Sequence, residues 1–197
     1  MTAEEFCEFA HRPENDDGWY ELDRGQVIVL DRPTRLMSFL TATFSVRLGK
    51  YADELGTCYA VCGDCGVILR RDPDTVRGPD VAVYDDFDSL MDRSLHYDEV
   101  TPLLAVELLS PSERPMRIMR KAADYLAAGT RLVWLIDPET RTALVYRADR
   151  VPQVIEADGT LEGEDVLPGF RRKLSDFFLM PGECGGSPLA ETTPHRP

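Results

Sequence analysis

Hydrophobic and polar positions follow one another along the chain with periods that predict both helices and strands. Residues 33–55 carry apolar side chains at spacings of three and four, which is the period of one helical face, and Gly56 suits the helix end. The members of that face are Leu36, Phe39, Leu40, Phe44, Leu48, Tyr51 and Leu55. A second helix is predicted from Pro115 to Ala128, followed by Gly129. Its expected apolar face consists of Ile118, Met119, Ala122, Ala123 and Leu126.

Short apolar runs outside these helices predict strands. They lie within residues 19–30 (a hairpin turning at Asp23-Arg24-Gly25), 57–71, 80–84, 103–109, 132–136, 142–146 and 153–155. The runs at 103–109 and 132–136 are almost wholly apolar, as strands covered on both faces are. Because the second helix connects these two runs, we expect them to be parallel neighbours in a mixed sheet. The predicted fold class is therefore α/β, with a mixed central sheet flanked by helices.

Length and composition favour one soluble domain. The chain has 197 residues, of which 43% are hydrophobic and 29% charged. We expect a domain at 19–179, preceded by a short helix and polar loop at 1–18. The tail at 180–197 is rich in Gly, Ser, Pro and Thr, which predicts disorder. No apolar run is long enough to span a membrane, and the acidic N-terminus lacks the apolar core of a signal peptide. A cytoplasmic location is the resulting expectation.

The charge balance bears on the choice of partner. The net charge is −13 and the pI is about 4.6. Strong, sequence-blind binding to DNA depends on neutralising phosphates with basic side chains, so an acidic chain argues against it. A local basic groove remains compatible with this total.

Two carboxylates stand out against apolar surroundings. Glu107 lies in the middle of an apolar strand, where an unpaired charge is costly, so it should be ion-paired, protonated or bound to metal. Asp80 opens a different short apolar strand after Pro79. Together they could hold Mg²⁺ (or Mn²⁺), which usually binds one or two carboxylates plus water and phosphate oxygens, and the Leu108 carbonyl could add a ligand.

A lysine on the second predicted helix could approach the same place. Lys121 shares a helix edge with Arg117, and Arg114 lies one turn further back. If the apolar face beside that edge docks on the sheet, the Lys121 ammonium would lie over the strand ends that carry Asp80 and Glu107. There it could neutralise charge on a phosphate. Lys121 and Arg131 are also the two cations that could pair with a buried Glu107 in a purely structural role.

Several segments in fixed order carry a family resemblance. They are Tyr20-Glu21-Leu22 with Gly25, Gly78-Pro79-Asp80-Val81-Ala82-Val83, Ala105 to Ser112, Lys121 to Gly129, and Val133-Trp134-Leu135-Ile136-Asp137-Pro138. This series resembles the Uma-type restriction endonuclease family of the PD-(D/E)XK nuclease superfamily over roughly residues 18–178. The resemblance implies a restriction-endonuclease-like fold and Mg²⁺-dependent hydrolysis of phosphodiesters, most simply in DNA. It also implies that Asp80 and Glu107 hold the metal and that Lys121, with Glu21 at an early acidic position, completes the catalytic set.

The same resemblance shows two departures and leaves alternatives open. Relatives have a histidine near the start of the first long helix, where this chain has Arg35-Leu36-Met37, and an acidic residue at the position of Arg117. By analogy with nucleases of this fold, homodimers are expected. The competing interpretation is a catalytically degenerate nuclease fold that acts as a binding or assembly module.

Cysteines suggest a third class, a cysteine-liganded redox or metal protein. The chain has five cysteines and no export signal, which favours reduced thiols. Cys58, Cys62 and Cys65 have the spacing of a cluster-binding loop, but a zinc site would need a fourth ligand. The alternation of Cys58, Ala60 and Cys62 also suits a strand in which cysteine is a small apolar residue.

Overall fold

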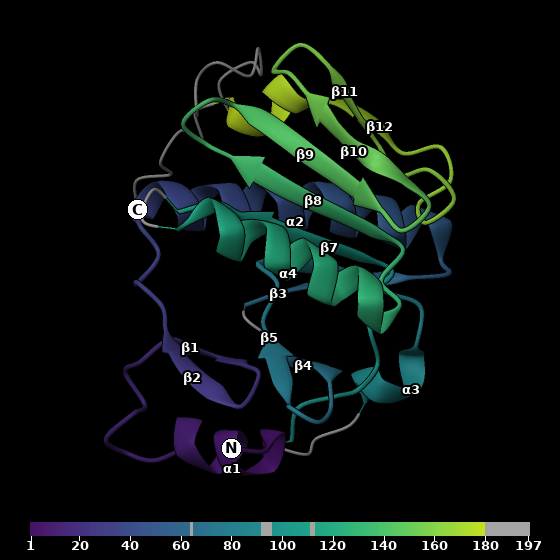
Figure 1. Ribbon diagram of the computed structural model, residues 1–197. Helices are drawn as coiled ribbons and strands as arrows, with labels where there is room; N and C mark the ends of the chain where they lie inside the picture. Colours follow the sequence, from purple (N-terminus) through teal and green to yellow (C-terminus); the bar gives the residue numbers. More distant parts are fainter. Residues whose placement is uncertain (64, 92–95, 111–112, 180–197) are drawn as a thin grey trace, which may run out of the picture.

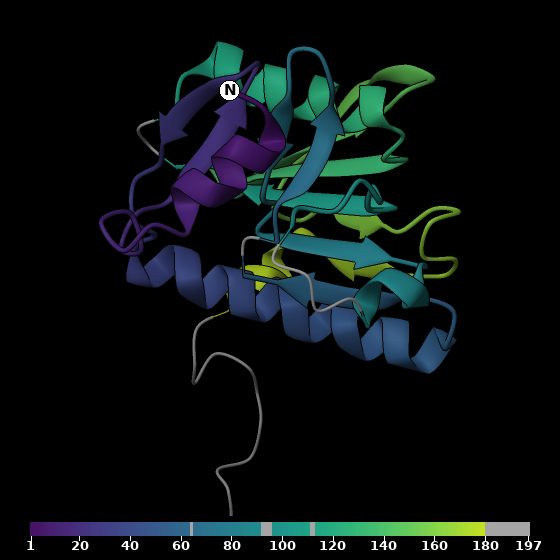
Figure 2. The same cartoon turned by 90° about the horizontal axis from the view of Figure 1, so that it is seen from below.

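Two β-sheets and two long helices organise the chain in the computed structural model (Figure 1), which describes residues 1–63, 65–91, 96–110 and 113–179. The helices α2 and α4 lie on opposite faces of the larger sheet, as the view from below shows (Figure 2). The smaller sheet and the short helix α1 lie beside this layered part. None of the helices in the described residues is long and apolar enough to cross a membrane.

The larger sheet has six strands in the order β10-β9-β8-β7-β6-β3. Their bounds are β3 Tyr59–Cys62, β6 Val81–Tyr84, β7 Leu104–Leu108, β8 Leu132–Asp137, β9 Thr142–Arg147 and β10 Arg150–Ile155. β7 and β8 are parallel, as expected from the helix between them, and the other neighbours are antiparallel. The predicted mixed central sheet flanked by helices is thus confirmed. Every residue of β6 and β7 is buried, which matches their apolar sequences.

The smaller sheet has the strand order β2-β1-β5-β4. Its strands are β1 Tyr20–Asp23, β2 Gln26–Val29, β4 Val67–Arg70 and β5 Thr75–Arg77. α1 (Ala3–Ala10) begins with a capping box between Thr2 and Glu5, and it packs Phe6 against Leu22 and Val76 of this sheet. The predicted hairpin is confirmed. β5, which precedes the apolar run of β6, was not predicted.

One face of the larger sheet is covered by α2 (Arg35–Leu55). Thr34 caps its first turn and Gly56, with a φ of 67°, ends it as the sequence predicts. Leu40, Phe44 and Leu48 are buried in the main core, whereas Leu36, expected on the same face, is 43% exposed. The core is completed by residues of β11 (Thr160–Glu162) and of a 3₁₀ helix at Leu174–Phe178, whereas β12 (Arg171–Lys173) is exposed. The sequence predicted none of these three elements.

The opposite face is covered by α4 (Pro115–Ala128), whose bounds agree with the sequence prediction. The predicted face is partly wrong. Met119 and Ala123 are exposed, and the buried residues are Lys121, Ala122 and Tyr125. The helix is therefore rotated so that a lysine and a tyrosine, rather than a methionine and an alanine, point to the sheet.

β10 forms one edge of the larger sheet. Val151 is 84% exposed and Val154 is 56% exposed, although both lie within the strand. Between them is Pro152, and the register with β9 shifts between Arg150 and Gln153. A backbone N–H is therefore missing at one position of this edge, and the ladder is irregular at the same place.

The remaining expectations concern the chain ends and the irregular segments. The single-turn helix α3 (Phe87–Leu90), which follows β6, was not predicted. The predicted disordered tail, together with Cys184, lies outside the described residues. The predicted boundary at residue 18 stays a prediction.

Candidate active site

Glu107 is a buried carboxylate on β7 that faces α4. Its neighbours in the strand alternate between the sheet's two faces, so Ala105 and Glu107 turn toward α4 while Val106 joins the core under α2. Glu107 is 3% exposed. The Lys121 ammonium lies 2.9 Å from its Oε2, and the Tyr125 hydroxyl donates to its Oε1 at 2.7 Å. Because Lys121 and Tyr125 are one helical turn apart, α4 presents both to the same carboxylate.

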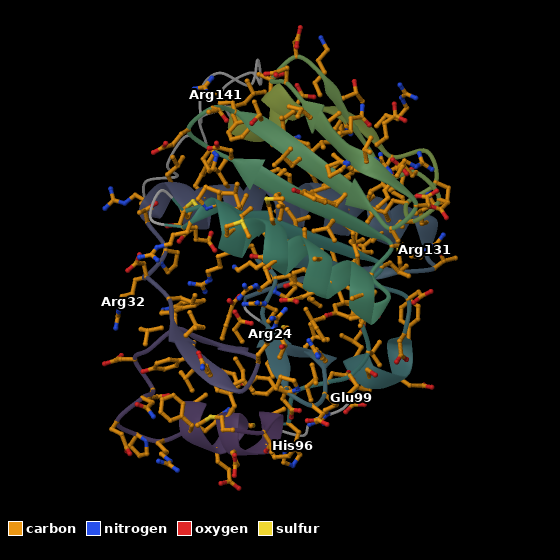
Figure 3. All side chains as sticks on the ribbon, in the orientation of Figure 1. Arg24, Arg32, His96, Glu99, Arg131 and Arg141 are labelled. Atoms are coloured by element: carbon orange, nitrogen blue, oxygen red, sulfur yellow. The ribbon has the colours of Figure 1, made fainter. Side chains whose placement is uncertain are left out.

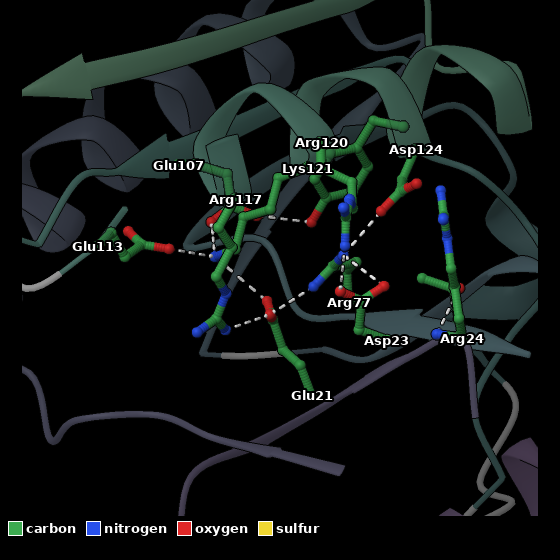
Figure 4. Close-up of polar contacts among 12 residues, drawn as sticks. Glu21, Asp23, Arg24, Arg77, Glu107, Glu113, Arg117, Arg120, Lys121 and Asp124 are labelled. Carbon is green, nitrogen blue, oxygen red and sulfur yellow. Dashed lines mark hydrogen bonds and ion pairs between the residues drawn. The ribbon is translucent and has the colours of Figure 1, made fainter. Parts of the chain in front are cut away.

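The Lys121 ammonium is surrounded by carboxylates from three segments (Figure 4). Besides Glu107 on β7, it lies 3.2 Å from Oε1 of Glu21 on β1 and 3.3 Å from Oε1 of Glu113, just before α4. Lys121 itself is only 5% exposed. A single ammonium thus links the larger sheet, the smaller sheet and the start of α4.

A second cation, Arg77, continues this network on the other side of Glu21. Arg77 ends β5 and is fully buried at 0% exposure. Its guanidinium donates to Oε2 of Glu21 at 2.8 Å and to Oδ2 of Asp124 on α4 at 2.7 Å. A guanidinium presents its donors in a planar fork, so it can bridge two carboxylates that a compact ammonium cannot.

Two further arginines of α4 reach the hairpin from the more exposed side. Arg117 donates to Oε2 of Glu21 at 3.0 Å, and Arg120 lies 3.4 Å from Oδ2 of Asp23. Their side chains are 26% and 44% exposed. The edge of α4 that faces β1 is therefore lined by basic side chains above the buried carboxylates.

Asp80 lies beside Glu107 because of the sheet register. Val81 pairs with Val106 in the antiparallel β6–β7 ladder, so the preceding Asp80 falls opposite Glu107. The Leu108 amide donates to Oδ2 of Asp80 at 2.7 Å, which anchors the aspartate at the end of β7. The contact of Leu108 with this site is made by its amide, whereas the sequence had suggested its carbonyl as a ligand.

The pKa values of the carboxylates are driven in opposite directions. Burial raises the pKa of Glu107 to about 7; the Lys121 ammonium opposes this effect, while Glu21 and Asp80 add to it. Burial also acts to raise the pKa of Glu21, but Lys121, Arg77 and Arg117 outweigh it and hold that pKa below its usual value. Burial would lower the pKa of Lys121, yet Glu107, Glu21 and Glu113 raise it, so the amine is charged. Glu107 is therefore the carboxylate whose charge is least compensated.

The donor set suits a hard divalent cation. Six carboxylates, those of Glu21, Asp23, Asp80, Glu107, Glu113 and Asp124, face the four basic groups of Arg77, Arg117, Arg120 and Lys121. With all six carboxylates ionised the cluster has two negative charges in excess, which one divalent ion would balance. Oxygen ligands are those that Mg²⁺ and Mn²⁺ prefer. Oε1 of Glu21 and Oε1 of Glu113 are ion-paired with Lys121 but accept no hydrogen bond from the described residues.

The site is built on a pair of carboxylates, not on a larger cage. Within residues 1–63, 65–91, 96–110 and 113–179, no three His, Cys, Asp or Glu side chains are grouped so as to hold an ion. This finding includes the cysteines, of which Cys58 is buried whereas Cys62 and Cys65 are exposed. A pair fits Mg²⁺, which usually keeps several waters and binds one or two carboxylates.

Of the predicted site residues, Glu107, Lys121 and Glu21 meet through direct contacts, and Asp80 joins them through the Leu108 amide. Between the two cations considered for Glu107, Lys121 is the partner, and Arg131 pairs with Asp165 instead. The sequence pattern does not point to Arg77, Glu113, Asp124 or Tyr125 as site residues. Arg77 had a usable signal, because it is a charged residue beside apolar Val76, just before Gly78-Pro79-Asp80.

Comparisons with known proteins agree with the fold. Residues 3–175 match the model of the family Uma2, described as "Putative restriction endonuclease". Among solved structures, the chain is similar to one described as a putative nuclease belonging to DUF820 from Anabaena variabilis. The TM-score is 0.75 at 20% identity, and the match covers 90% of this chain and 97% of that one. A comparison with curated proteins found no match.

Proposed function

The chain belongs to the Uma2 family of restriction-endonuclease-like nucleases, and from this premise we propose that it is a metal-dependent endonuclease that hydrolyses phosphodiester bonds in DNA. The ion we propose is Mg²⁺ or Mn²⁺. Its ligands would be the carboxylates of Asp80 and Glu107, with the Leu108 carbonyl as a further candidate. Lys121 would be the third catalytic group, and Glu21 would complete the site.

The observation that carries the proposal is the pairing of Asp80 with Glu107 across β6 and β7, beside the Lys121 ammonium. The two carboxylates belong to a cluster with two excess negative charges, and Glu107 has its pKa raised to about 7 by burial and by Glu21 and Asp80. A divalent ion would remove that excess. When bound, such an ion supplies Lewis-acid polarisation of a phosphoryl oxygen and a water of lowered pKa.

The protein's own groups would divide the remaining work. Lys121 is held in its charged form by Glu107, Glu21 and Glu113, so it could stabilise negative charge that develops on a phosphate. Tyr125 donates to one oxygen of Glu107 and so fixes the orientation of that carboxylate. Arg77 and Arg117 hold Glu21, which in turn fixes the position of Lys121.

Calorimetric titration with Mn²⁺, followed by incubation with supercoiled plasmid, tests the proposal. The variants are Glu107→Ala and Asp80→Asn, and the matched control is Glu54→Ala, an exposed carboxylate on α2 at the other face of the sheet. Wild type and the control are expected to bind Mn²⁺ and to nick the plasmid. The two site variants are expected to lose at least tenfold in Mn²⁺ affinity, as loss of a metal-site group does, and to leave the plasmid intact.

Other results would assign the failure to one part of the proposal. If wild type binds Mn²⁺ through Glu107 but leaves DNA intact, the metal site stands and DNA is the wrong substrate. If wild type binds no metal, Glu107 is a structural charge, and a non-catalytic binding or assembly module becomes the better interpretation.

A further inference from the structure

α4 concentrates positive charge in an otherwise acidic chain. Between residues 114 and 128 there are four basic residues, Arg114, Arg117, Arg120 and Lys121, and one acidic residue, Asp124. This segment therefore has a net charge of +3, whereas the whole chain has −13. Arg117, Arg120 and Lys121 are paired with carboxylates of β1 and β7, whereas Arg114 has no such partner among the described residues, so its charge is available to a polyanion.

Arg117 and Arg120 lie on the side of α4 that meets the β1–β2 hairpin, and Arg114 precedes Arg117 by three positions, the spacing of neighbours along one helix edge. Arg117 and Arg120 contact Glu21 and Asp23 of β1, so this edge of the helix faces the hairpin. Arg24 lies at the hairpin turn directly after Asp23, and its side chain also points toward α4 (Figure 4). Figure 3 shows Arg24 close to α4, and Arg131 and Arg141 elsewhere on the molecule.

These arginines still have donors to offer to a ligand. Arg24 and Arg114 are exposed, and neither side chain forms an ion pair with any residue that the structure describes. Arg117 and Arg120 each make one ion pair through one terminal nitrogen, although a guanidinium has five N–H donors.

We propose that Arg24, Arg114, Arg117 and Arg120, here named the arginine edge, bind the phosphate backbone of duplex DNA next to the catalytic carboxylates. This inference rests on the proposed nuclease function and names the surface through which the substrate is held. Guanidinium groups match phosphate geometry through paired hydrogen bonds. Because Arg117 and Arg120 also hold Glu21 and Asp23, the arginine edge joins the backbone-binding surface directly to the site around Lys121.

The arginine edge also accounts for how an acidic protein could use DNA as a substrate. The excess negative charge of the cluster beneath it would repel phosphates until a divalent ion is bound. The arginines would then supply a limited number of phosphate contacts, so binding should be moderate and strongly dependent on salt.

The test is fluorescence anisotropy of a labelled 30-base-pair duplex over a series of NaCl concentrations. Ca²⁺ replaces Mg²⁺, and a gel confirms that the duplex remains intact. The double variant Arg24→Gln/Arg114→Gln removes two charges without touching an ion pair of the site. Its matched control is Arg141→Gln/Arg172→Gln, two exposed arginines on the β8–β9 turn and on β12. Thermal unfolding verifies that both doubles fold like wild type.

The expected result is a loss of about tenfold to a hundredfold in affinity for the Arg24→Gln/Arg114→Gln protein at 0.1 M salt. The slope of log K against log salt should fall by about two, one for each phosphate contact. The control should keep the wild-type slope. Equal salt slopes for the Arg24→Gln/Arg114→Gln protein and wild type would overturn the arginine edge. An equal loss of affinity in the Arg141→Gln/Arg172→Gln control would overturn it as well.

Failure of the proposed function would look different. In that case wild type would neither bind nor cleave the duplex with any divalent ion. Both the proposed nuclease function and the proposed DNA-binding surface would then be wrong. If wild type binds and cleaves while the Arg24→Gln/Arg114→Gln protein does so equally well, only the arginine edge is wrong.

Discussion

Nζ of Lys121 lies 2.9 Å from Oε2 of Glu107, and both side chains are almost fully withdrawn from solvent. The pair is not isolated, because the same ammonium also faces Glu21 and Glu113. Removing one partner of such a buried pair leaves an uncompensated charge, which costs far more than the loss of an exposed ion pair. The stability of the apoprotein should therefore depend on individual side chains of the site.

Replacing Lys121 with methionine is expected to lower the free energy of unfolding by about 3–5 kcal/mol in metal-free buffer, because three carboxylates would lose their shared cation. Urea unfolding measures the change. Lys173→Met, at an exposed position on β12, is the control and should change stability by about 0.5 kcal/mol or less. A loss below about 1 kcal/mol for Lys121→Met would contradict the buried network.

Tyr125→Phe is expected to cost about 1–3 kcal/mol, since the substitution leaves Oε1 of Glu107 without its hydroxyl donor inside the protein. Chemical unfolding again gives the value. Tyr51→Phe removes a comparable hydroxyl contact, to the Pro168 carbonyl, at an exposed place and should cost less. Equal losses of stability in the two variants would show that the hydroxyl contact with Glu107 contributes no more than the exposed contact does.

Arg77→Lys keeps the charge but not the fork that joins Glu21 at 2.8 Å to Asp124 at 2.7 Å. Because an ammonium cannot bridge both carboxylates in the same geometry, we expect a loss of about 2 kcal/mol or more in the free energy of unfolding. Arg172→Lys, an exchange at an exposed position, provides the comparison and should be neutral. If Arg77→Lys is equally neutral, positive charge alone suffices at this position.

Asp74 provides a pH-dependent test away from the site. Burial acts to raise the pKa of Asp74, but the amides of Ala3 and Asp72 and the Arg71 guanidinium outweigh it and hold the pKa below the usual 3.8. A lowered pKa stabilises the fold above the unfolded value, and that stability is lost as the pH falls through the folded value. Asp74→Asn should thus be less stable than wild type at pH 7, and the difference should shrink below pH 4.

Measuring both proteins by thermal unfolding between pH 2.5 and 7 gives this difference directly. Asp53→Asn, at an exposed position on α2, should show no comparable trend. A stability difference between wild type and Asp74→Asn that is constant over the whole range would count against the lowered pKa.

Much of the fold could be predicted because its long elements are strongly patterned. α2 and α4 have clear helical periods and are followed in the sequence by Gly56 and Gly129, which mark their ends. The apolar runs of β7 and β8 indicate strands that are covered on both faces. β5, β11 and β12 are only three residues long and derive their place from tertiary pairing. Local patterns carry too little information for elements of that length.

The site was harder to predict than the fold because polar residues there take positions that hydrophobicity assigns to apolar ones. On α4 the apolar pattern favours burial of Met119, whereas the protein buries Lys121 in its place. The lysine is compensated by carboxylates from β1 and β7, which lie 100 and 14 positions earlier in the chain for Glu21 and Glu107. Only the three-dimensional arrangement reveals such partners.

The open edge at β10 bears on how the molecule behaves in a crowded solution. Sheet edges with free amides and exposed valines recruit further strands, which is the first step of fibril growth. Pro152 interrupts the row of donors between Val151 and Val154, and the irregular register twists the strand at the same place. Both features oppose extension of the larger sheet by a neighbouring molecule along β10, and we expect the two exposed valines to be tolerated for this reason.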